Sequence, residues 1–451
     1  MLTHPVAGAE AFFAELRQRE FARLDANRVA YLDYAGSGLY AESQVNAHRS
    51  LLARSVFGNP HSEHSASRAS TAAIDAARRQ VLRFLDAGDD YVVCFTANAS
   101  AAIKLVAESY PFGEGAVCVL AADNHNSVNG IREFAGRAGA AVEYLPLRDD
   151  LRLDHPEARL AQIGGGGLFG FPAQSNFSGV HHPLSLVAAA QSMGYHVLLD
   201  AAAFVPVHGL SLRACPADFV ALSFYKVFGY PSGLGALVAK RDALRALTRP
   251  WFAGGTIEYA SVQLRRHRLR AFQDGFEDGT ASFLDIAALD SGFAFRNSVG
   301  TMRLAGHVMT LTKELLEGLT ALRHRDGGPL VRVYGPGPRD SGRGGTIAFN
   351  VLDRDGRCVP YGLVEDRANA AGVHLRGGCF CNPGAAEAAL RFDADRLSRC
   401  LDSLGDGFSM PRLRECLGPD VAVGAVRASL GLASNRRDIR RALDVLASFA
   451  S

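Results

Sequence analysis

The chain has few cysteines, little excess charge and no long apolar run. Its eight cysteines, at positions 94, 118, 215, 358, 379, 381, 400 and 416, follow no zinc-finger spacing and form no dense disulfide framework. We therefore expect reduced thiols and a cytoplasmic location. The chain has no stretch of about 18 uncharged apolar residues, which excludes a membrane-spanning helix. Residues 12–20 form an amphipathic pattern rather than the apolar core of a signal peptide.

The net charge is only +2 over 451 residues, so nothing suggests binding to nucleic acid or to an anionic membrane. The four glycines at 164–167 lack the spacing of a dinucleotide-binding motif, and the sequence contains no internal repeat. Apolar residues make up 48% of the chain and charged residues 21%, an ordinary globular balance. A chain of this length predicts two or three structural units.

Strand-like and helix-like stretches alternate from about residue 70 to residue 300. The expected strands are short, nearly continuous apolar runs, as found in sheets that are covered on both faces. This alternation predicts an α/β fold with a mostly parallel sheet and helices on both faces. The runs are expected at residues 91–95, 116–120, 167–171, 196–199, 219–223 and 235–238.

The pattern changes after about residue 300. A long helix-like stretch at 302–322 precedes a strand-like stretch at 346–351, and the chain ends with strand-like and helix-like stretches at 426–430 and 435–448. We expect a large domain over 51–300 and a smaller α/β domain over 301–451. We also expect residues 1–50 to complete the small domain and to bring the start of the chain over the active site.

Lys226 and Asp200 each follow a predicted strand, in Ala-Leu-Ser-Phe-Tyr-Lys-Val-Phe-Gly and His-Val-Leu-Leu-Asp respectively. Ligands of such sheets bind beyond the carboxyl ends of the strands. An amine and a carboxylate placed there suit pyridoxal phosphate (PLP), because the lysine can form a Schiff base and the aspartate can keep the pyridine nitrogen protonated. Either residue alone would be read as an ordinary surface lysine or strand-end aspartate.

Three further segments fit a PLP site. Ala99 and Ser100 open a predicted helix, whose free N–H groups favour a phosphate, although a simple helix cap explains this segment equally well. His125 follows the next strand, where it could stack on the pyridine ring or be structural. Asn176 follows another strand and could bond the ring hydroxyl or form an Asx turn.

A second chemical focus is the segment Arg-Gly-Gly-Cys-Phe-Cys-Asn-Pro-Gly, which begins at Arg376. An arginine can bind an amino-acid carboxylate in bidentate fashion, and a cysteine on a glycine-rich loop can act as a nucleophile. Cys379 and Cys381 are two residues apart, so in an extended segment both thiols would point to the same side. The alternative is a pair of ordinary thiols, since no further metal ligands can be assigned.

Together these segments resemble the class V aminotransferases, a fold-type I family of PLP-dependent transferases. Within that family they resemble the cysteine desulfurases, and most of all the N-terminal domain of the molybdenum cofactor sulfurases. The resemblance runs from Tyr-Leu-Asp-Tyr-Ala-Gly at residue 31 to Val-Arg-Ala-Ser-Leu-Gly at residue 426. It includes Pro-Ala-Gln-Ser-Asn-Phe-Ser-Gly at 172, Phe-Glu-Asp-Gly-Thr at 276 and Gly-Cys-Phe-Cys-Asn at 378.

The resemblance implies a role for each candidate residue. Lys226 would carry PLP, His125 would stack on its ring, and Arg376 would bind the substrate carboxylate. Cys381 matches the nucleophile of the Arg-x-Gly-x-x-Cys loop, which leaves the part played by Cys379 open. The remaining cofactor ligands would be Ala99, Ser100 and Ser223 at the phosphate, Asn176 at the ring hydroxyl, Asp200 at the pyridinium, and Thr280 at the phosphate of the opposite subunit of a homodimer.

These roles imply a desulfurase that converts L-cysteine, or a related amino acid, to alanine and leaves a persulfide on Cys381. Tyr225 and Ala203 stand where most desulfurases have histidine and glutamine, which is similar to the molybdenum cofactor sulfurase branch. The sulfur acceptor stays open. The alternatives are another PLP enzyme of class V, such as a C–S lyase, aminotransferase, racemase or decarboxylase in a biosynthetic pathway, and a non-enzymatic scaffold. Intact Lys226, Asp200 and Cys381 argue against the scaffold.

Overall fold

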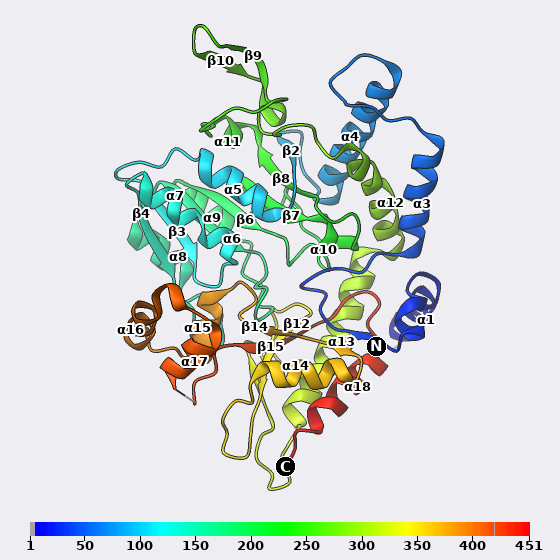
Figure 1. Cartoon of the computed structure of the whole chain (residues 1–451), viewed down its shortest axis with the longest axis vertical. Helices are drawn as coiled ribbons and strands as arrows, with labels where there is room; N and C mark the ends of the chain where they lie inside the picture. The colour runs from blue at the N-terminus through cyan, green and yellow to red at the C-terminus, as the bar shows by residue number, and fades with distance from the viewer. Residues whose placement is uncertain (1–4, 419) are drawn as a thin grey trace.

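The computed structural model of the protein describes residues 5–418 and 420–451 (Figure 1). Its largest element is a seven-stranded sheet with the strand order β2-β8-β7-β6-β5-β3-β4. Five of these strands run parallel, and β8 is antiparallel to both of its neighbours, β2 and β7. The strands are β2 (Tyr91–Thr96), β3 (Val117–Ala121), β4 (Ala141–Leu145), β5 (Gly167–Pro172), β6 (Tyr195–Asp200), β7 (Phe219–Ser223) and β8 (Gly235–Lys240).

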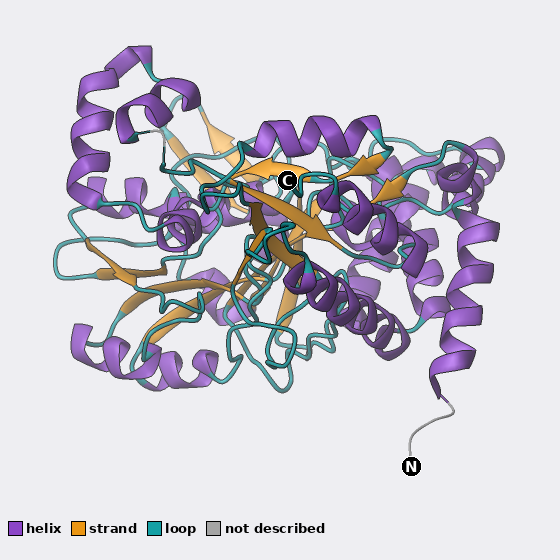
Figure 2. Ribbon diagram, turned by 90° about the horizontal axis from the view of Figure 1, so that it is seen from below, coloured by secondary structure: helices purple, strands orange, loops and turns teal. Residues whose placement is uncertain are grey.

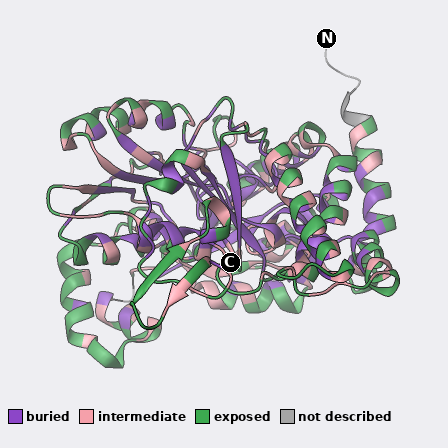
Figure 3. Cartoon of the chain, turned by 90° about the horizontal axis from the view of Figure 1, so that it is seen from above, coloured by how far each residue is buried: buried purple, intermediate pink, exposed green. Residues whose placement is uncertain are grey.

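Helices cover both faces of this sheet, as the continuous apolar strands predicted. One face packs on a core that includes side chains of α4, α8, α9 and α12, and the other on a core formed with α5, α6, α7 and α11. Figure 2 shows these helices around the central strands, and Figure 3 shows that the strands are buried. The helices are α4 (Ser65–Phe84), α5 (Ala99–Ser109), α6 (Asn126–Asn129), α7 (Ile131–Arg137), α8 (Pro156–Ile163), α9 (Leu186–Ser192), α11 (Arg241–Arg245) and α12 (Phe283–Val299).

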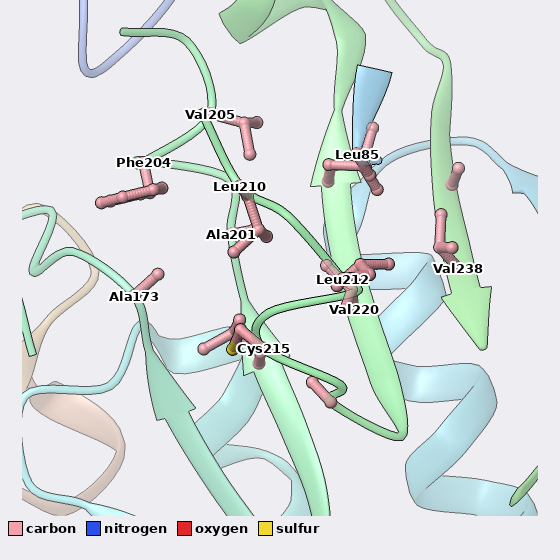
Figure 4. Close-up of a cluster of buried hydrophobic side chains, with 14 of the residues drawn as sticks. Leu85, Ala173, Ala201, Phe204, Val205, Leu210, Leu212, Cys215, Val220 and Val238 are labelled. Atoms are coloured by element: carbon pink, nitrogen blue, oxygen red, sulfur yellow. The ribbon is translucent and has the colours of Figure 1, made fainter. Parts of the chain in front are cut away.

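The first of these cores continues past the strand ends. Ala173 and Ala201 directly follow β5 and β6, and they pack with Phe204 and Val205 (Figure 4). All four side chains are buried. The backbone beyond the strand ends is therefore held by packing, which gives the residues that follow β5 and β6 defined positions.

A second, four-stranded antiparallel sheet has the order β11-β12-β15-β14. Its strands are β11 (Val331–Tyr334), β12 (Thr346–Val351), β14 (Arg376–Gly378) and β15 (Ala425–Ser429), and short strands β1 (Ala30–Tyr31) and β13 (Val373–His374) pair beside it. The helices of this part are α13 (Thr301–Ala321), α14 (Tyr361–Ala370), α15 (Pro383–Leu390), α16 (Ala394–Leu404), α17 (Met410–Leu417) and α18 (Arg436–Ala447).

The N-terminal segment packs on the small sheet and its helices. Helix α1 (Pro5–Glu20) and helix α2 (Ala22–Ala26) share a core with α13 and α18, and Arg17 forms a buried 2.6 Å ion pair with Asp438. The later residues 33–40 approach the Lys226 region, where Gly38 N–H donates to the Tyr225 carbonyl. It is this loop, rather than helix α1, that borders the site.

The remaining elements lie at the margins of the large sheet. Strands β9 (Ile257–Ser261) and β10 (Arg266–Leu269) form a hairpin that projects from the body (Figure 1), while α3 (Glu42–Arg54) packs against α12. Helix α10 (Phe224–Phe228) follows β7 directly. None of the described helices is both long and apolar enough to cross a membrane.

One expectation about the cysteines was wrong. Cys400 on α16 and Cys416 on α17 form a disulfide, so not all of the thiols are free. The two helices pack against each other around a minor core, which brings these side chains together although 16 positions separate them. Such a pairing depends on how two helices fold back, which cysteine spacing does not reveal.

Candidate functional site

The carboxyl ends of the parallel strands meet at one edge of the large sheet, and a pocket of about 200 Å³ lies there. Asp200 ends β6, Ser223 ends β7, and Lys226 lies on α10 immediately after β7. Asn176 follows β5, and His125 follows β3. All five line the pocket, which confirms that the predicted strands deliver these residues to one place.

One end of the pocket is formed by backbone N–H groups and serine hydroxyls at the start of α5. The Asn98 side chain caps the helix by accepting from Ala101 N–H at 3.0 Å, and Ser223 Oγ accepts from Ala99 N–H at 2.8 Å. Ser100 and Ser127 add hydroxyl groups that bond each other. A helix N-terminus with hydroxyl donors suits a phosphate. Ala99, Ser100 and Ser223 therefore lie where the sequence predicted them.

Lys226 and Asp200 lie at the centre of the pocket. Burial lowers the pKa of Lys226, and the nearby charges of Arg427 and Arg376 lower it further, while Asp200 opposes them. Asp200 Oδ1 accepts from Ala202 N–H at 3.0 Å, which fixes the carboxylate. A lysine with a lowered pKa is unprotonated more of the time, and it is then available as a nucleophile or base.

His125 is held as a neutral ring. Its Nδ1 accepts from Ser127 N–H at 3.1 Å, which assigns the proton to Nε2. Burial lowers the pKa of His125, and the charges of Lys226 and Arg427 lower it further against the opposing effect of Asp200. Two residues earlier, Asp123 pairs with His182 at 2.8 Å in the core, where both side chains are fully buried. This pair anchors the loop that carries His125.

The cysteine loop is hydrogen-bonded to Asn176, which lines the pocket, and to Asn126, which lies between two lining residues. Asn176 Nδ2 donates to the Phe380 carbonyl at 2.7 Å, and Asn126 N–H donates to the Cys381 carbonyl at 2.7 Å. Asn382, fully buried, donates through Nδ2 to the Asp123 carbonyl at 2.6 Å and to Asn176 Oδ1 at 2.9 Å. Asn176 keeps one N–H for a ring hydroxyl. Asn382 was not predicted, because its role depends on these distant partners.

The two thiols of this loop differ in exposure, and the loop is not the extended segment for which both would point to the same side. Phe380 and Cys381 both have positive φ values, 57° and 55°, so the backbone turns sharply between the cysteines. Cys381 is exposed, whereas Cys379 is partly buried and its Sγ donates to the Val423 carbonyl at 3.3 Å. Left-handed backbone at non-glycine residues is not visible in a sequence.

The structure adds an arginine that the sequence interpretation missed. Arg427 on β15 is 2% exposed and donates to the Asn176 carbonyl at 3.0 Å and to Asp33 at 2.9 Å. The predicted Arg376 binds the same Asp33 at 2.6 Å, but its side chain is 48% exposed. Arg427 thus lies deeper, beside the pocket. An arginine inside the short apolar strand Val-Arg-Ala-Ser was the available signal, because buried strands rarely carry unpaired charge.

Gln174 is a second lining residue that was not predicted. Its side chain is buried and lines the pocket beside Lys226, and its Oε1 bonds His181 Nε2 at 2.9 Å. Thr280 does not line the pocket of its own chain. Its Oγ1 accepts from the Asn59 side chain at 3.3 Å on the protein surface. The described residues contain no cluster of three or more His, Cys, Asp or Glu side chains suited to a metal.

The donor set of the pocket fits PLP. The α5 N-terminus and the hydroxyls of Ser100 and Ser223 suit its phosphate, and Asp200 suits a protonated pyridine nitrogen. Lys226 lines the same pocket, and its amine would attach to the aldehyde carbon.

Comparison with known proteins agrees with this fit. The sequence model described as Aminotransferase class-V matches residues 30–442. The molybdenum cofactor sulfurase of Arabidopsis thaliana is 35% identical over 97% of this chain and 58% of its own length. That of Bos taurus is 36% identical over 94% of this chain and 50% of its own length. The chain thus spans between half and three fifths of the curated relatives it matches.

Among solved structures, a cysteine desulfurase from Thermococcus onnurineus NA1 superposes with a TM-score of 0.80 at 23% identity. The match covers 96% of this chain and 97% of that protein. At such identity the likeness concerns the fold, which is the fold-type I arrangement of a mostly parallel sheet flanked by helices.

Proposed function

Because the chain belongs to the class V aminotransferase family, we propose that it is a PLP-dependent cysteine desulfurase that moves the sulfur of L-cysteine onto Cys381 and releases alanine. The observation that carries this proposal is the attachment of an exposed cysteine to the cofactor pocket. The loop of Cys381 is hydrogen-bonded to Asn126 and Asn176, which flank the pocket. A lyase that eliminates sulfide has no need of a cysteine held in this position.

PLP, when bound, supplies an electron sink that stabilises negative charge at the α-carbon of the substrate. Lys226 would hold the cofactor and, once released by the substrate amine, would move the proton at the α-carbon. Its lowered pKa supports the basic form that both tasks need. Asp200 would keep the pyridine nitrogen protonated, and His125 would cover one face of the ring.

Arg427 and Arg376 would bind the substrate carboxylate, with Arg427 as the deeper ligand. Both contact Asp33, whose pKa would rise on burial, but hydrogen bonding to Arg376 and the charge of Arg427 lower it overall. A substrate carboxylate would share or replace these contacts. Bidentate recognition by arginine would orient the substrate thiol outward, towards the loop of Cys381.

Cys381 would then attack the substrate sulfur as a thiolate. The bond between this sulfur and the β-carbon breaks, the Cys381 Sγ–S bond forms, and the β-carbon takes up a proton, so alanine leaves and a persulfide remains. One thiol and one molecule of cysteine thus give one persulfide and one molecule of alanine, with no external oxidant. The exposure of Cys381 would let an acceptor collect the sulfur.

The direct test is product analysis with L-cysteine and PLP-loaded protein. We expect alanine, together with a persulfide that peptide mass spectrometry maps to Cys381. Pyruvate, ammonia and free sulfide in place of alanine would instead identify a C–S lyase. The loaded protein should be yellow, and borohydride should abolish the visible band and fix the cofactor to Lys226.

We further propose that the enzyme is a homodimer in which Thr280 completes the phosphate site of the partner. Thr280 lies on the surface beside Asn59, and the preceding Gly279 donates to the carbonyl of Gly254, shortly before the β9–β10 hairpin. Large apolar side chains are exposed on and before that hairpin, among them Trp251 at 54%, Val262 at 94% and Leu264 at 69%. Apolar surface of this kind marks association sites.

A mixing experiment tests this assembly. Lys226→Ala and Thr280→Ala subunits, mixed and allowed to exchange, should form hybrid dimers with one complete site, so activity should rise above that of either variant alone. The control is a mixture of the two variants that have each been cross-linked beforehand, so that their subunits cannot exchange. An active monomer in light scattering would contradict the proposal.

A further inference from the structure

The carboxylate of Asp33 lies between the two arginines of the proposed substrate site. Arg376 donates to it through Nε, at 3.0 Å from both oxygens, and through Nη2, at 2.6 Å from Oδ2. Arg427 donates through Nη2 to the other oxygen, Oδ1, at 2.9 Å. The side chains of Arg376, Asp33 and Arg427 are 48%, 13% and 3% exposed, so the three charges lead from the surface to the interior.

The backbone of Asp33 is fixed to the small sheet. Asp33 forms a parallel bridge with Ser429 of β15, and Ser429 Oγ accepts from Ala35 N–H at 2.8 Å. Gly36 allows the arginine to approach closely, because a Cβ there would lie 2.6 Å from Nη2 of Arg376. The carboxylate is therefore part of the site, and a substrate carboxylate would bind beside it rather than move it away.

Asp33 sets the net charge of this group. Burial would raise the pKa of Asp33, but hydrogen bonding to Arg376 and the charge of Arg427 lower it overall, so the carboxylate is ionised at neutral pH. Two guanidinium charges and one carboxylate charge leave a single positive charge. Glu365, which accepts from Gly377 N–H at 2.6 Å, also acts on Arg376 through its charge, and it is unchanged in every comparison below.

We propose that Asp33 is a specificity-determining residue, which cancels one arginine charge so that the site prefers an acid group with one negative charge to an acid group with two. The preferred substrates are then amino acids with an ordinary α-carboxylate, and analogues with a phosphonate in its place are rejected. The inference rests on the proposed function, which places the substrate carboxylate at Arg427 and Arg376. Without Asp33, two uncompensated guanidinium groups would suit a doubly charged group, as arginine clusters suit phosphates.

The first test compares two ligands that differ in the charge of the acid group. L-alanine carries one negative charge there, and its phosphonate analogue carries close to two at about pH 8, as phosphate groups do above their second pKa of about 6. Isothermal titration calorimetry on the PLP-loaded protein gives both dissociation constants without turnover. Wild type should bind L-alanine more tightly than the phosphonate.

Asp33→Asn keeps the shape of the side chain and removes its charge. The affinity for the phosphonate, relative to L-alanine, should rise about tenfold or more, because the doubly charged group gains more from the added positive charge. Asp75→Asn, at an exposed position on α4, changes the net charge of the protein equally and is the matched control. That variant should leave the affinity ratio within about twofold of wild type, since an exposed distant charge is screened by salt.

The second test separates charge from contact. Arg376→Gln leaves no net charge in the group, so the affinity ratio should move about tenfold in the opposite direction, towards L-alanine. The double variant Asp33→Asn/Arg376→Gln again has one positive charge. Its ratio should return to within about threefold of wild type, although the native ion pair between the two residues is gone. If Asp33 only held the arginines in place, the double variant would differ from wild type at least as much as Asp33→Asn does.

These outcomes decide the inference separately from the proposed function. An unchanged ratio in Asp33→Asn, or a double variant that does not return towards wild type, would show that Asp33 does not set the selectivity, while alanine formation from L-cysteine would still support the desulfurase. If Asp33→Asn does not fold, Arg376→Gln at its half-exposed position still decides, because an unchanged ratio there contradicts the inference. Absence of alanine from L-cysteine would overturn the proposed function, whereas calorimetry needs no turnover.

Discussion

The two ends of the candidate site are built in different ways. The cofactor end consists of residues that directly follow buried strands of the seven-stranded sheet, and its donors are backbone N–H groups and short side chains. The sulfur end is a loop after β14 of the small sheet in which Cys381 is exposed, and hydrogen bonds from Asn126, Asn176 and Asn382 hold it in place. The first end is fixed by packing, and the second by a few polar contacts between distant segments.

Because of this difference, a substitution at one end of the site should leave the other end intact. Packing over a whole sheet tolerates the loss of one surface group, whereas a loop held by a few hydrogen bonds changes its position when one of them is removed. Variants at the cofactor end should therefore affect cofactor binding, and variants at the sulfur end should affect the fate of sulfur while the cofactor remains bound.

The largest effect is expected for Lys226→Ala. Loss of the amine removes the covalent attachment and the base, so alanine formation should fall about 10⁴-fold or more. The visible band of the loaded protein should shift, and borohydride should no longer fix the cofactor. Lys104→Ala, at an exposed position on α5, is the control and should behave like the wild type. If Lys226→Ala still formed alanine within tenfold of the wild-type rate, the proposed role of Lys226 at the cofactor end would be wrong.

Cys381→Ser should impair sulfur transfer almost as strongly, but it should not affect cofactor binding. The variant should keep the spectrum of the loaded wild type and still respond spectrally to L-cysteine, because Cys381 does not line the cofactor pocket. Persulfide formation should be undetectable by mass spectrometry. Undiminished sulfide release by this variant would show that no nucleophilic cysteine is needed, which favours a lyase.

Substitutions of the two arginines, Arg427 and Arg376, should raise the KM for L-cysteine to different extents. Arg427→Ala should raise the KM for L-cysteine about 100-fold, because truncating a buried charge partner costs about 2–5 kcal/mol. Arg376→Ala should raise it about tenfold or less, since that side chain is half exposed. Steady-state kinetics with separate kcat and KM values provide the comparison, and Arg427→Lys tests whether charge alone suffices. Equal effects would show that Arg376 is as important as the sequence predicted.

The smallest expected effect is on the free energy of unfolding, and it comes from His181, which is hydrogen-bonded to Gln174. Burial lowers the pKa of His181 to about 3, and the neighbouring His208 and His182 add to this. Because the unfolded chain binds a proton near pH 6.5 and the folded protein does not, the free energy of unfolding should fall as pH falls below 6.5. Each such histidine contributes about 1.4 kcal/mol per pH unit.

His181→Gln should remove this contribution. Urea unfolding between pH 6.5 and 4 should give a shallower loss of stability for the variant than for the wild type, and the difference isolates this histidine from the carboxylates. Gln174 should keep a partner in the variant, since glutamine can also donate to its Oε1. Parallel slopes for the two proteins would show that His181 is charged in the folded state.

Much of the cofactor end could be predicted from sequence because its residues are tied to strand ends. A short apolar run with β-branched residues identifies each strand, and the parallel arrangement brings the following residues together. Asp200 and Lys226 were placed in this way, whereas Ser223 was assigned only through the family resemblance. Strand β4, whose residues are partly exposed at the edge of the sheet, was missed because it lacks a continuous apolar run.

The sulfur end could be predicted only in part. The motif that begins at Arg376 identified a reactive loop, but the direction of each thiol depends on positive φ values at Phe380 and Cys381. Nothing in the residue types demands that conformation, since most non-glycine residues avoid it. The disulfide between Cys400 and Cys416 does not follow from local pattern either.

The sequence by itself determined the strands, the residues that follow them and hence the chemistry that meets at the edge of the sheet. Only the tertiary structure decided that Arg427 lies deeper than Arg376, that Asn382 joins the cysteine loop to Asn176, and that Cys379 is partly buried while Cys381 is exposed. The physical reason is the distance along the sequence between the residues that interact. Strand formation follows from neighbouring residues, whereas hydrogen bonds between segments more than 200 positions apart exist only after both sheets have packed together.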